Sequence, residues 1–304
     1  SAMLSPSVDG EAFAFTNVTV TQALSESFLI TIGKFNTITL ADRWFYGGRG
    51  VEGFMNMNFV AAPIGGRTFP ISTLGAVATF LKDGAPMFTF GVMDSISPET
   101  SPGWDGLYAD ELTYFANYDF RTEIAGRPGW HTIGGSYSTI DTFSFDQSDL
   151  IKPPGQGGIS PNIQDDSWML KYHWDQSLSQ VGDDPSRGWG TFLFLAVSDA
   201  DPNPFGYSVA AGLVANGVCA ARPCDSFGVG VFYNEVSDEL RKALEQNRPI
   251  LPSIDIDHEL GGEIFYEFAV TDWFRIAADL QVTQPSIEDN DTAIFGGFRS
   301  RLIF

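Results

Sequence analysis

The sequence has few cysteines, few basic residues and no long apolar segment. Its 304 residues include two cysteines and three histidines, and 17 Lys and Arg residues stand against 38 Asp and Glu residues. The resulting net charge of −21 argues against a nucleic-acid-binding protein, which needs a basic face. No stretch approaches ~18 consecutive apolar residues, so the sequence contains no transmembrane helix.

Aromatic residues and glycine are abundant instead. Aromatic residues make up 14% of the chain, 26 of them Phe, and there are 32 glycines against only 18% charged residues. Disordered chains are poor in aromatic residues and rich in charge, so this composition excludes disorder. High glycine and Phe content without helical periodicity favours an all-β protein.

Alternating segments of about ten residues recur between clusters of turn residues. The last segment places Ile294, Phe298 and Leu302 on one face, and Arg299 and Arg301 on the other. Soluble strands are mostly about five or six residues long. Long strands with one apolar and one charged face are typical of a barrel with a lipid-facing surface and a polar lumen. The pattern predicts a transmembrane antiparallel β-barrel, with residues 1–304 as a single domain.

We expect about 13 strands in this chain. They are 12–24, 27–35, 73–81, 86–94, 107–120, 130–143, 167–176, 189–198, 206–215, 227–235, 258–270, 273–283 and 293–304. Short and long connections alternate, as in barrels with short periplasmic turns and long outer loops. Residue 1 would then lie outside the cell, so we expect an odd number of strands before it. A missed or spurious strand, giving about 12 or 14, is the alternative.

Two cysteines, Cys219 and Cys224, are separated by four residues. This spacing does not match the two-residue spacing of common zinc and redox motifs. We therefore expect a small structural disulfide within a turn, which would indicate an oxidising compartment.

Several stretches resemble the carbohydrate-selective porins of the OprB type. They are 33–37 (GKFNT), 54–56 (FMN), 59–63 (FVAAP), 231–235 (VFYNE), 261–271 (GGEIFYEFAVT) and 278–282 (ADLQV). The resemblance implies a monomeric barrel of about 16 strands in the Gram-negative outer membrane, which passes small sugars by diffusion. Three further strands upstream would complete that number. The terminal Phe304 resembles the recognition signal for the barrel-assembly machinery.

The longest outer connection, 36–72, is the candidate pore constriction. It combines arginine donors, aromatic plates that suit sugar rings, and glycines that let the backbone fold back. The candidate constriction residues are Arg43, Trp44, Tyr46, Arg49, Glu52 and Arg67. The family resemblance favours a loop folded into the pore, and the alternative is a loop packed on the barrel rim.

Charged residues of the alternating segments are candidates for the lumen wall. Those of the last three strands are Glu259, Glu263, Glu267, Arg275, Asp279, Arg299 and Arg301, and elsewhere Lys34 and Arg121 are similar candidates. One role is a transverse field that orients polar solutes. The other is a ladder of charge pairs that stiffens the wall.

The three histidines form no convincing catalytic triad with serine, so we expect no enzymatic activity. We also expect no cofactor. The acidic outer loops 199–203 and 288–291 could hold Ca²⁺ or cations that bridge lipopolysaccharide. The segment 236–247 predicts a short helix with Ser237 as its N-cap.

The sequence therefore predicts an outer-membrane porin for passive diffusion of small carbohydrates through a narrow constriction lined by arginine and aromatic residues. A general or anion-preferring porin is one alternative, and a plugged structural or adhesive surface barrel is another. The expected partners are small sugars, outer-membrane lipid, lipopolysaccharide and the assembly machinery, with no nucleic acid. We expect the protein to be a monomer.

Overall fold

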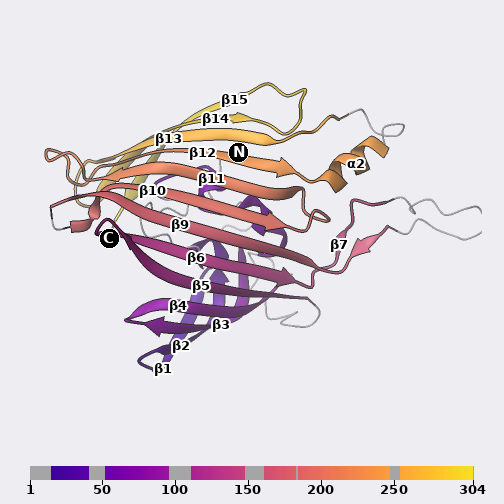
Figure 1. Ribbon diagram of the computed structural model, residues 1–304, viewed down its shortest axis with the longest axis horizontal. Helices are drawn as coiled ribbons and strands as arrows, with labels where there is room; N and C mark the ends of the chain where they lie inside the picture. The colour runs from indigo at the N-terminus through magenta and orange to yellow at the C-terminus, as the bar shows by residue number, and fades with distance from the viewer. Residues whose placement is uncertain are drawn as a thin grey trace, which may run out of the picture.

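The computed structural model describes residues 15–40, 52–95, 111–147, 161–182, 184–246 and 254–303. These residues form an antiparallel sheet of 13 strands, in which each strand pairs with its neighbours in the chain (Figure 1). A separate two-stranded sheet lies in the connection between the sixth and seventh of these strands. Among the described residues, no helix is long and apolar enough to cross a membrane.

The large sheet begins near the start of the described chain and ends with its last strand. Its strands are β1 (Val18–Ser25), β2 (Phe28–Asn36), β3 (Ser72–Lys82), β4 (Ala85–Asp94), β5 (Leu112–Ile124), β6 (Arg127–Ser138), β9 (Ser167–Val181), β10 (Asp184–Ser198), β11 (Phe205–Asn216), β12 (Ser226–Val236), β13 (Glu259–Ala269), β14 (Phe274–Gln284) and β15 (Ala293–Leu302). The connections contain η1 (Thr37–Leu40), α1 (Met57–Val60), η2 (Pro63–Arg67), β7 (Thr142–Phe143), β8 (Ile163–Gln164) and α2 (Asp238–Gln246).

The predicted strands correspond one to one to the strands of the large sheet, but two turns are much shorter than we expected. The predicted turn 121–129 consists of Ala125 and Gly126, because the ladder continues to the pair Ile124 and Arg127. Both turn residues have positive φ angles, of 52° and 73°. Likewise, β9 and β10 extend into the predicted turn 177–188. Backbone pairing therefore continues beyond the point where the alternation of side chains weakens.

Long and short connections lie at opposite ends of the sheet. The turns β1–β2, β3–β4, β5–β6 and β9–β10 are at one end, and α2 and β7 are at the other (Figure 1). We call these the short-turn end and the long-loop end. Within the described residues, no ladder joins β1 to β15.

The helix predicted over 236–247 is confirmed as α2. The Ser237 hydroxyl accepts a hydrogen bond from the backbone N–H of Leu240 at 3.1 Å, which makes Ser237 its N-cap. Arg241 in this helix pairs with Glu235 at 2.7 Å and with Asp257 at 3.3 Å. These pairs attach the helix to the end of β12 and to the segment before β13.

The two faces of the large sheet differ in chemistry. In β13, Glu263 and Phe265 are buried on one face, whereas Ile264 and Phe268 are exposed on the other. Directly paired residues of neighbouring strands share a face, so this assignment can be followed through the sheet. We call the face of Glu263 the inner face. The outer face exposes a broad row of apolar residues, which suits contact with lipid rather than water.

Candidate functional site

Part of the predicted constriction loop packs against the inner face. Phe54, Phe59 and Ile64 are almost completely buried in an apolar cluster with side chains of the sheet. Those sheet side chains are Met169, Phe192, Phe194, Ala196, Ala210, Val214, Phe232 and Phe265. We call residues 52–67 the inner segment, because they lie on the inner face of β9–β13.

The aromatic rings of this cluster meet edge to face. The Phe54 ring centroid lies 4.9 Å from that of Phe265 at 82°, and the Phe59 centroid lies 5.8 Å from that of Phe232 at 77°. Gly230 provides space for them, since a Cβ there would approach the Phe59 ring to 2.7 Å. Glycine in the strand and aromatic rings in the loop are therefore complementary in shape.

The buried carboxyl group of Glu263 holds the inner segment in place. Its two oxygens accept hydrogen bonds from the backbone N–H groups of Met55 at 2.6 Å and Asn56 at 2.7 Å. Both loop residues are themselves buried. A buried N–H group without an acceptor costs about 1–3 kcal/mol, so Glu263 fixes the backbone where the segment enters α1.

A chain of buried amide side chains continues this attachment. Asn234 of β12 donates to the Asn58 side-chain oxygen at 2.8 Å and to Glu259 at 3.3 Å. Asn56 donates to Gln281 of β14 at 3.1 Å and also accepts the Asn58 backbone N–H at 3.0 Å, as the N-cap of α1. These bonds link the inner segment to β12, β13 and β14.

The arginines of β14 and β15 surround one carboxylate. Glu267 lies 3.0 Å from Arg301, 3.5 Å from Arg299 and 3.9 Å from Arg275. Arg301 also pairs with Glu52 of the inner segment. Arg299 donates a hydrogen bond to the backbone oxygen of Gly53 at 3.1 Å. The three arginines therefore form the charge pairs that one interpretation of the sequence requires, and Arg299 and Arg301 contact the loop as well.

The other candidate residues are distributed as follows. Asp279 accepts a hydrogen bond from Gln281 at 2.8 Å on the inner face. Arg43, Trp44, Tyr46 and Arg49 lie outside the described residues, as does the side chain of Arg67. Their part in the constriction stays a prediction.

Lys34 is not a lumen-wall residue. It pairs with Val18 on one side and Leu74 on the other, on the face opposite to Thr31 and Phe35. Thr31 and Phe35 line a cavity on the inner face. The prediction for Lys34 was wrong because the strand alternation places an aromatic residue inside and a lysine outside at the long-loop end of β2.

Four tryptophans, Trp130, Trp168, Trp189 and Trp273, lie near strand ends, which is the position of the aromatic girdle of an outer-membrane barrel. The last three are exposed, and the strand pairing places Trp168 and Trp189 on the outer face. Trp130 pairs with Arg121 and Asp175 and lines the inner cavity. A tryptophan at a strand end indicates the membrane–water interface. The face of the sheet on which it lies depends on its position in the alternation of side chains along the strand.

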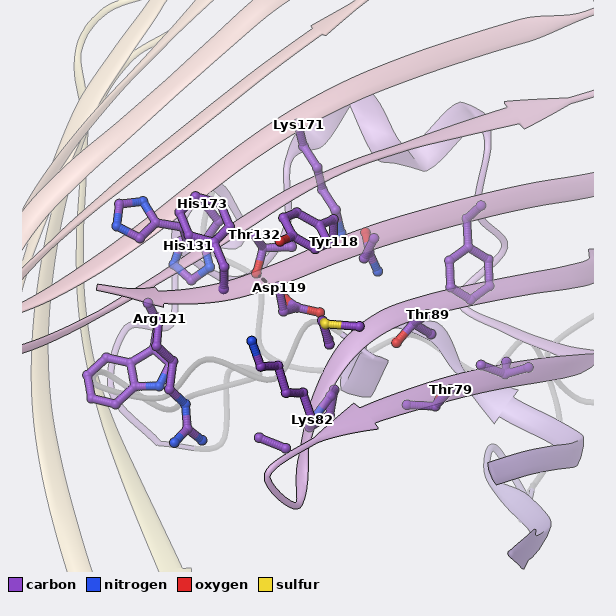
Figure 2. A pocket seen from close by; sticks show the side chains of 18 of the residues that line it. Thr79, Lys82, Thr89, Tyr118, Asp119, Arg121, His131, Thr132, Lys171 and His173 are labelled. Atoms are coloured by element: carbon purple, nitrogen blue, oxygen red, sulfur yellow. Dashed lines mark hydrogen bonds between the residues drawn. The ribbon is translucent and has the colours of Figure 1, made fainter. Parts of the chain in front are cut away.

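The inner face of β1–β6 and β9 borders a cavity of about 780 Å³. It extends from the aromatic residues Phe35 and Phe115 towards the β3–β4 turn at the short-turn end. Figure 2 shows Arg121, Asp119 and Lys171 among its lining side chains. Arg121 is thus on the lumen side, as the sequence predicts. The constriction candidates from the sequence did not include Asp119 or Lys171, although strand alternation already put both on a polar face.

The expected disulfide is absent, because Cys219 and Cys224 are free and exposed. The turn that contains them is held by Arg222 and Asp225 instead, with nitrogen–oxygen distances of 2.9 and 3.0 Å. Arg222 also lies 3.6 Å from the Phe268 ring centroid. An ion pair therefore does the structural work that we assigned to a disulfide.

The pKa of Asp225 is lowered in the folded turn. Burial alone would raise its pKa, but hydrogen bonds from Arg222, Tyr266 and the Ala269 backbone N–H together lower the pKa below its ordinary value. The ionised form of Asp225 is thus favoured in the folded turn.

The acidic loop 199–203 uses its carboxylates within the protein. Asp201 accepts hydrogen bonds from Ser144 at 2.6 Å and from the Phe145 backbone at 2.8 Å. Asp199 accepts from Ser167 at 3.0 Å, and burial raises its pKa. No group of three or more potential metal ligands occurs among the described residues. The proposed Ca²⁺ or bridging cation stays a prediction.

The chain resembles known proteins along most of its length. Residues 5–304 match the family described as carbohydrate-selective porin, OprB family. Porin B of Pseudomonas aeruginosa is 27% identical over 193 residues, which is 58% of this chain and 41% of that protein. The match thus spans less than half of the curated relative.

Solved structures share the fold. The high-pH structure of Pseudomonas putida OprB matches with a TM-score of 0.83 and 20% identity, over 99% of this chain and 76% of that chain. The low-pH structure of the same protein matches with a TM-score of 0.54 and 17% identity, over 94% of this chain and 66% of that chain.

Proposed function

The chain belongs to the carbohydrate-selective porin, OprB, family and is a β-barrel protein of the Gram-negative outer membrane, and we propose that it conducts small carbohydrates by passive diffusion. The lumen is the space enclosed by the inner face. Short turns face the periplasm in barrels of this kind, so the long-loop end faces outside.

The attachment of the inner segment is the observation that carries this proposal. Phe54, Phe59 and Ile64 fill the space beside β9–β13, and Glu263 fixes the backbone next to them. The cavity of about 780 Å³ beside the opposite wall keeps room for a solute. A loop held inside the lumen narrows it without filling it, as a selective channel requires.

The constriction itself is part of the proposal. Residues 41–51 connect η1 to the inner segment, and they include Arg43, Trp44, Tyr46 and Arg49. Guanidinium groups donate to sugar hydroxyls, and aromatic rings stack on the apolar faces of pyranose rings. Arg67 follows in η2.

Planar-bilayer recordings of the full-length protein test the proposal. Single-channel current is titrated with glucose and then maltose. We expect concentration-dependent, saturable block. Arg43→Ala or Arg49→Ala is expected to weaken the block roughly two- to tenfold, the value of one hydrogen bond, without preventing assembly. If neither substitution changes the block, residues 41–51 are not the constriction.

The same recordings separate the alternatives. Open channels without block, together with a reversal potential that favours anions in a salt gradient, would indicate an anion-preferring porin. Silent bilayers from correctly inserted protein would indicate a plugged structural or adhesive barrel. Sugar conduction, the monomeric state, and contacts of Phe304 with the assembly machinery or of the loops with lipopolysaccharide all belong to the proposal.

A further inference from the structure

The wall opposite the inner segment carries polar side chains in two adjacent rows. In the first row, Asp119 pairs with Thr132, which pairs with His173. In the second, Asn117 pairs with Gly134, which pairs with Lys171. Paired residues share a face, so the side chains of both rows point into the cavity, and five of these residues line it. Figure 2 shows Asp119, Thr132, Lys171 and His173 together.

Gly134 brings the polar groups of the second row together. A Cβ at Gly134 would lie 2.1 Å from the side-chain oxygen of Asn117, so the amide of Asn117 lies over the glycine. The amide thus extends across β6 towards Lys171 on β9. Any larger residue at this position would displace it.

The carboxylate of Asp119 has two oxygens, and only one of them accepts a hydrogen bond from the described residues. Its Oδ1 accepts a hydrogen bond from Thr132 at 2.5 Å, and no hydrogen bond within the described part of the chain uses its other oxygen. The carboxylate interacts electrostatically with Lys171 and His173. A negative acceptor and a positive donor therefore lie in adjacent rows of the same wall and interact electrostatically.

We propose that Asp119 and Lys171 form a second sugar-contact station, which binds a neutral polyhydroxy solute between the inner segment and the periplasmic mouth. A carboxylate accepts from adjacent hydroxyls of one sugar, and an ammonium group donates to a hydroxyl or ring oxygen. The pair favours an uncharged sugar, because either ionic form of a sugar meets one repelling group at this place. This inference rests on the proposed function.

The test compares Asp119→Asn and Lys171→Gln with the wild type in the sugar-block titration. Each substitution is expected to raise the half-blocking concentration of glucose roughly fivefold, the value of about one hydrogen bond. Glucuronate separates the two charges. Asp119→Asn is expected to strengthen block by this sugar acid relative to glucose, whereas Lys171→Gln is expected to weaken it. Asp119→Glu keeps the charge and is expected to restore part of the glucose block.

Two surface variants control for the change of charge. Lys242→Gln and Asp238→Asn alter α2 side chains that are 65% and 74% exposed, away from the cavity. We expect both to keep the wild-type block. Heat-modifiable mobility on gels reports barrel assembly for every variant. Should Asp119→Asn fail to assemble, Lys171→Gln decides the question.

The outcomes distinguish the two proposals. If the wild type is blocked by glucose and both lumen variants are blocked at the same concentration, the station is refuted and the sugar channel stands. If the wild type is not blocked by glucose or maltose, both are refuted. A glucose-specific loss without the opposite glucuronate effects would refute the roles assigned to the two charges.

Discussion

The two halves of the inner wall are built from different residues for different tasks. The half formed by β10–β14 presents Phe192, Phe232 and Phe265 to the inner segment. The half formed by β2–β6 presents hydroxyl and amide side chains to the cavity, such as Thr31, Thr89 and Asn117, beside a smaller apolar cluster that includes Phe35 and Phe115. The larger apolar cluster lies on the first half and includes Phe54, Phe59 and Ile64 of the loop, whereas Phe69 packs on a smaller cluster of the second half. The apolar residues of the wall therefore determine which side of the lumen the inner segment occupies.

Polar residues are present in both halves but are used differently. On the loop-filled side, Glu263, Asn234 and Gln281 are buried and hydrogen-bonded to the inner segment. On the cavity side, Asp119 is half-buried, and one of its oxygens accepts no hydrogen bond from the described residues. A buried polar group must find its partner within the protein, whereas one at a water-filled cavity can exchange partners. The buried polar groups that hold residues 55–58 therefore lie on a different part of the wall from the proposed sugar contacts.

The largest change in conductance is expected when the inner segment is detached from the wall. Glu263→Ala removes the acceptor for the Met55 and Asn56 backbone N–H groups. Each buried donor left without a partner costs about 1–3 kcal/mol, so the segment is expected to leave the wall. Single-channel conductance should rise severalfold, and sugar block should weaken.

A matched substitution at the surface shows whether the effect is specific. Asp238→Ala removes a carboxylate that is 74% exposed on α2. We expect it to leave conductance at the wild-type value. Unchanged conductance in assembled Glu263→Ala channels would show that the hydrogen bonds of Glu263 do not hold the segment.

A smaller effect is expected from filling the space under the loop. In Gly230→Ala, the new methyl group would approach the Phe59 ring to 2.7 Å and the Phe54 ring to 3.2 Å. Overpacking of this kind costs about 1–3 kcal/mol. Urea unfolding of the protein in lipid vesicles measures the free energy of unfolding, which should fall by this amount.

Gly206→Ala is the control for that substitution. A Cβ at Gly206 meets no atom within 4 Å, so the variant is expected to have wild-type stability or slightly more. Equal stabilities for the two variants would mean that the rings do not pack tightly on β12.

Much of the sheet could be predicted from the sequence, because alternation reports directly which face a residue occupies. Glu263, Arg299 and Arg301 lie on the inner face as predicted, and His173 shares that face with Lys171 and Asp175. Alternation fails near strand ends, where a residue leaves the membrane and either type of side chain is tolerated. Lys34, near the end of β2, was assigned to the wrong face, and Trp130, near the start of β6, lies on the inner face although tryptophan at a strand end is typical of a lipid interface.

The partners of the inner-face residues could not be predicted, because they depend on contacts between distant segments. Glu263 hydrogen-bonds to a residue 208 positions away. Family resemblance and glycine content were the only indications in the sequence that loop 36–72 folds inward. Nothing in its local pattern shows that Phe59 fits against Gly230. The ion pair of Arg222 and Asp225 in the cysteine-containing turn likewise could not be predicted from residue spacing, because it requires the folded turn.

The smallest expected effect is a difference in pH dependence between the turns of the two halves at the short-turn end. The loop-filled half has the turn anchored by Asp225, whereas the cavity half has the two-residue turn Ala125 and Gly126. The pKa of Asp225 is lowered in the folded protein by hydrogen bonds that outweigh its burial. Its stabilising effect is therefore complete above the unfolded pKa of about 3.9 and is lost as the pH falls below that value.

Hydrogen–deuterium exchange at pH 3 and pH 6, corrected for intrinsic rates, measures this effect. We expect peptides that contain Ala269, whose N–H donates to Asp225 at 2.9 Å, to lose protection at pH 3. Peptides around Ala125 should keep theirs, since that turn has no such anchor in the described structure. In Asp225→Asn, the first set should be less protected at both pH values, because the charged acceptor is missing. A wild-type turn equally protected at both pH values would show that backbone pairing of β12 and β13, rather than Asp225, holds this end of the wall.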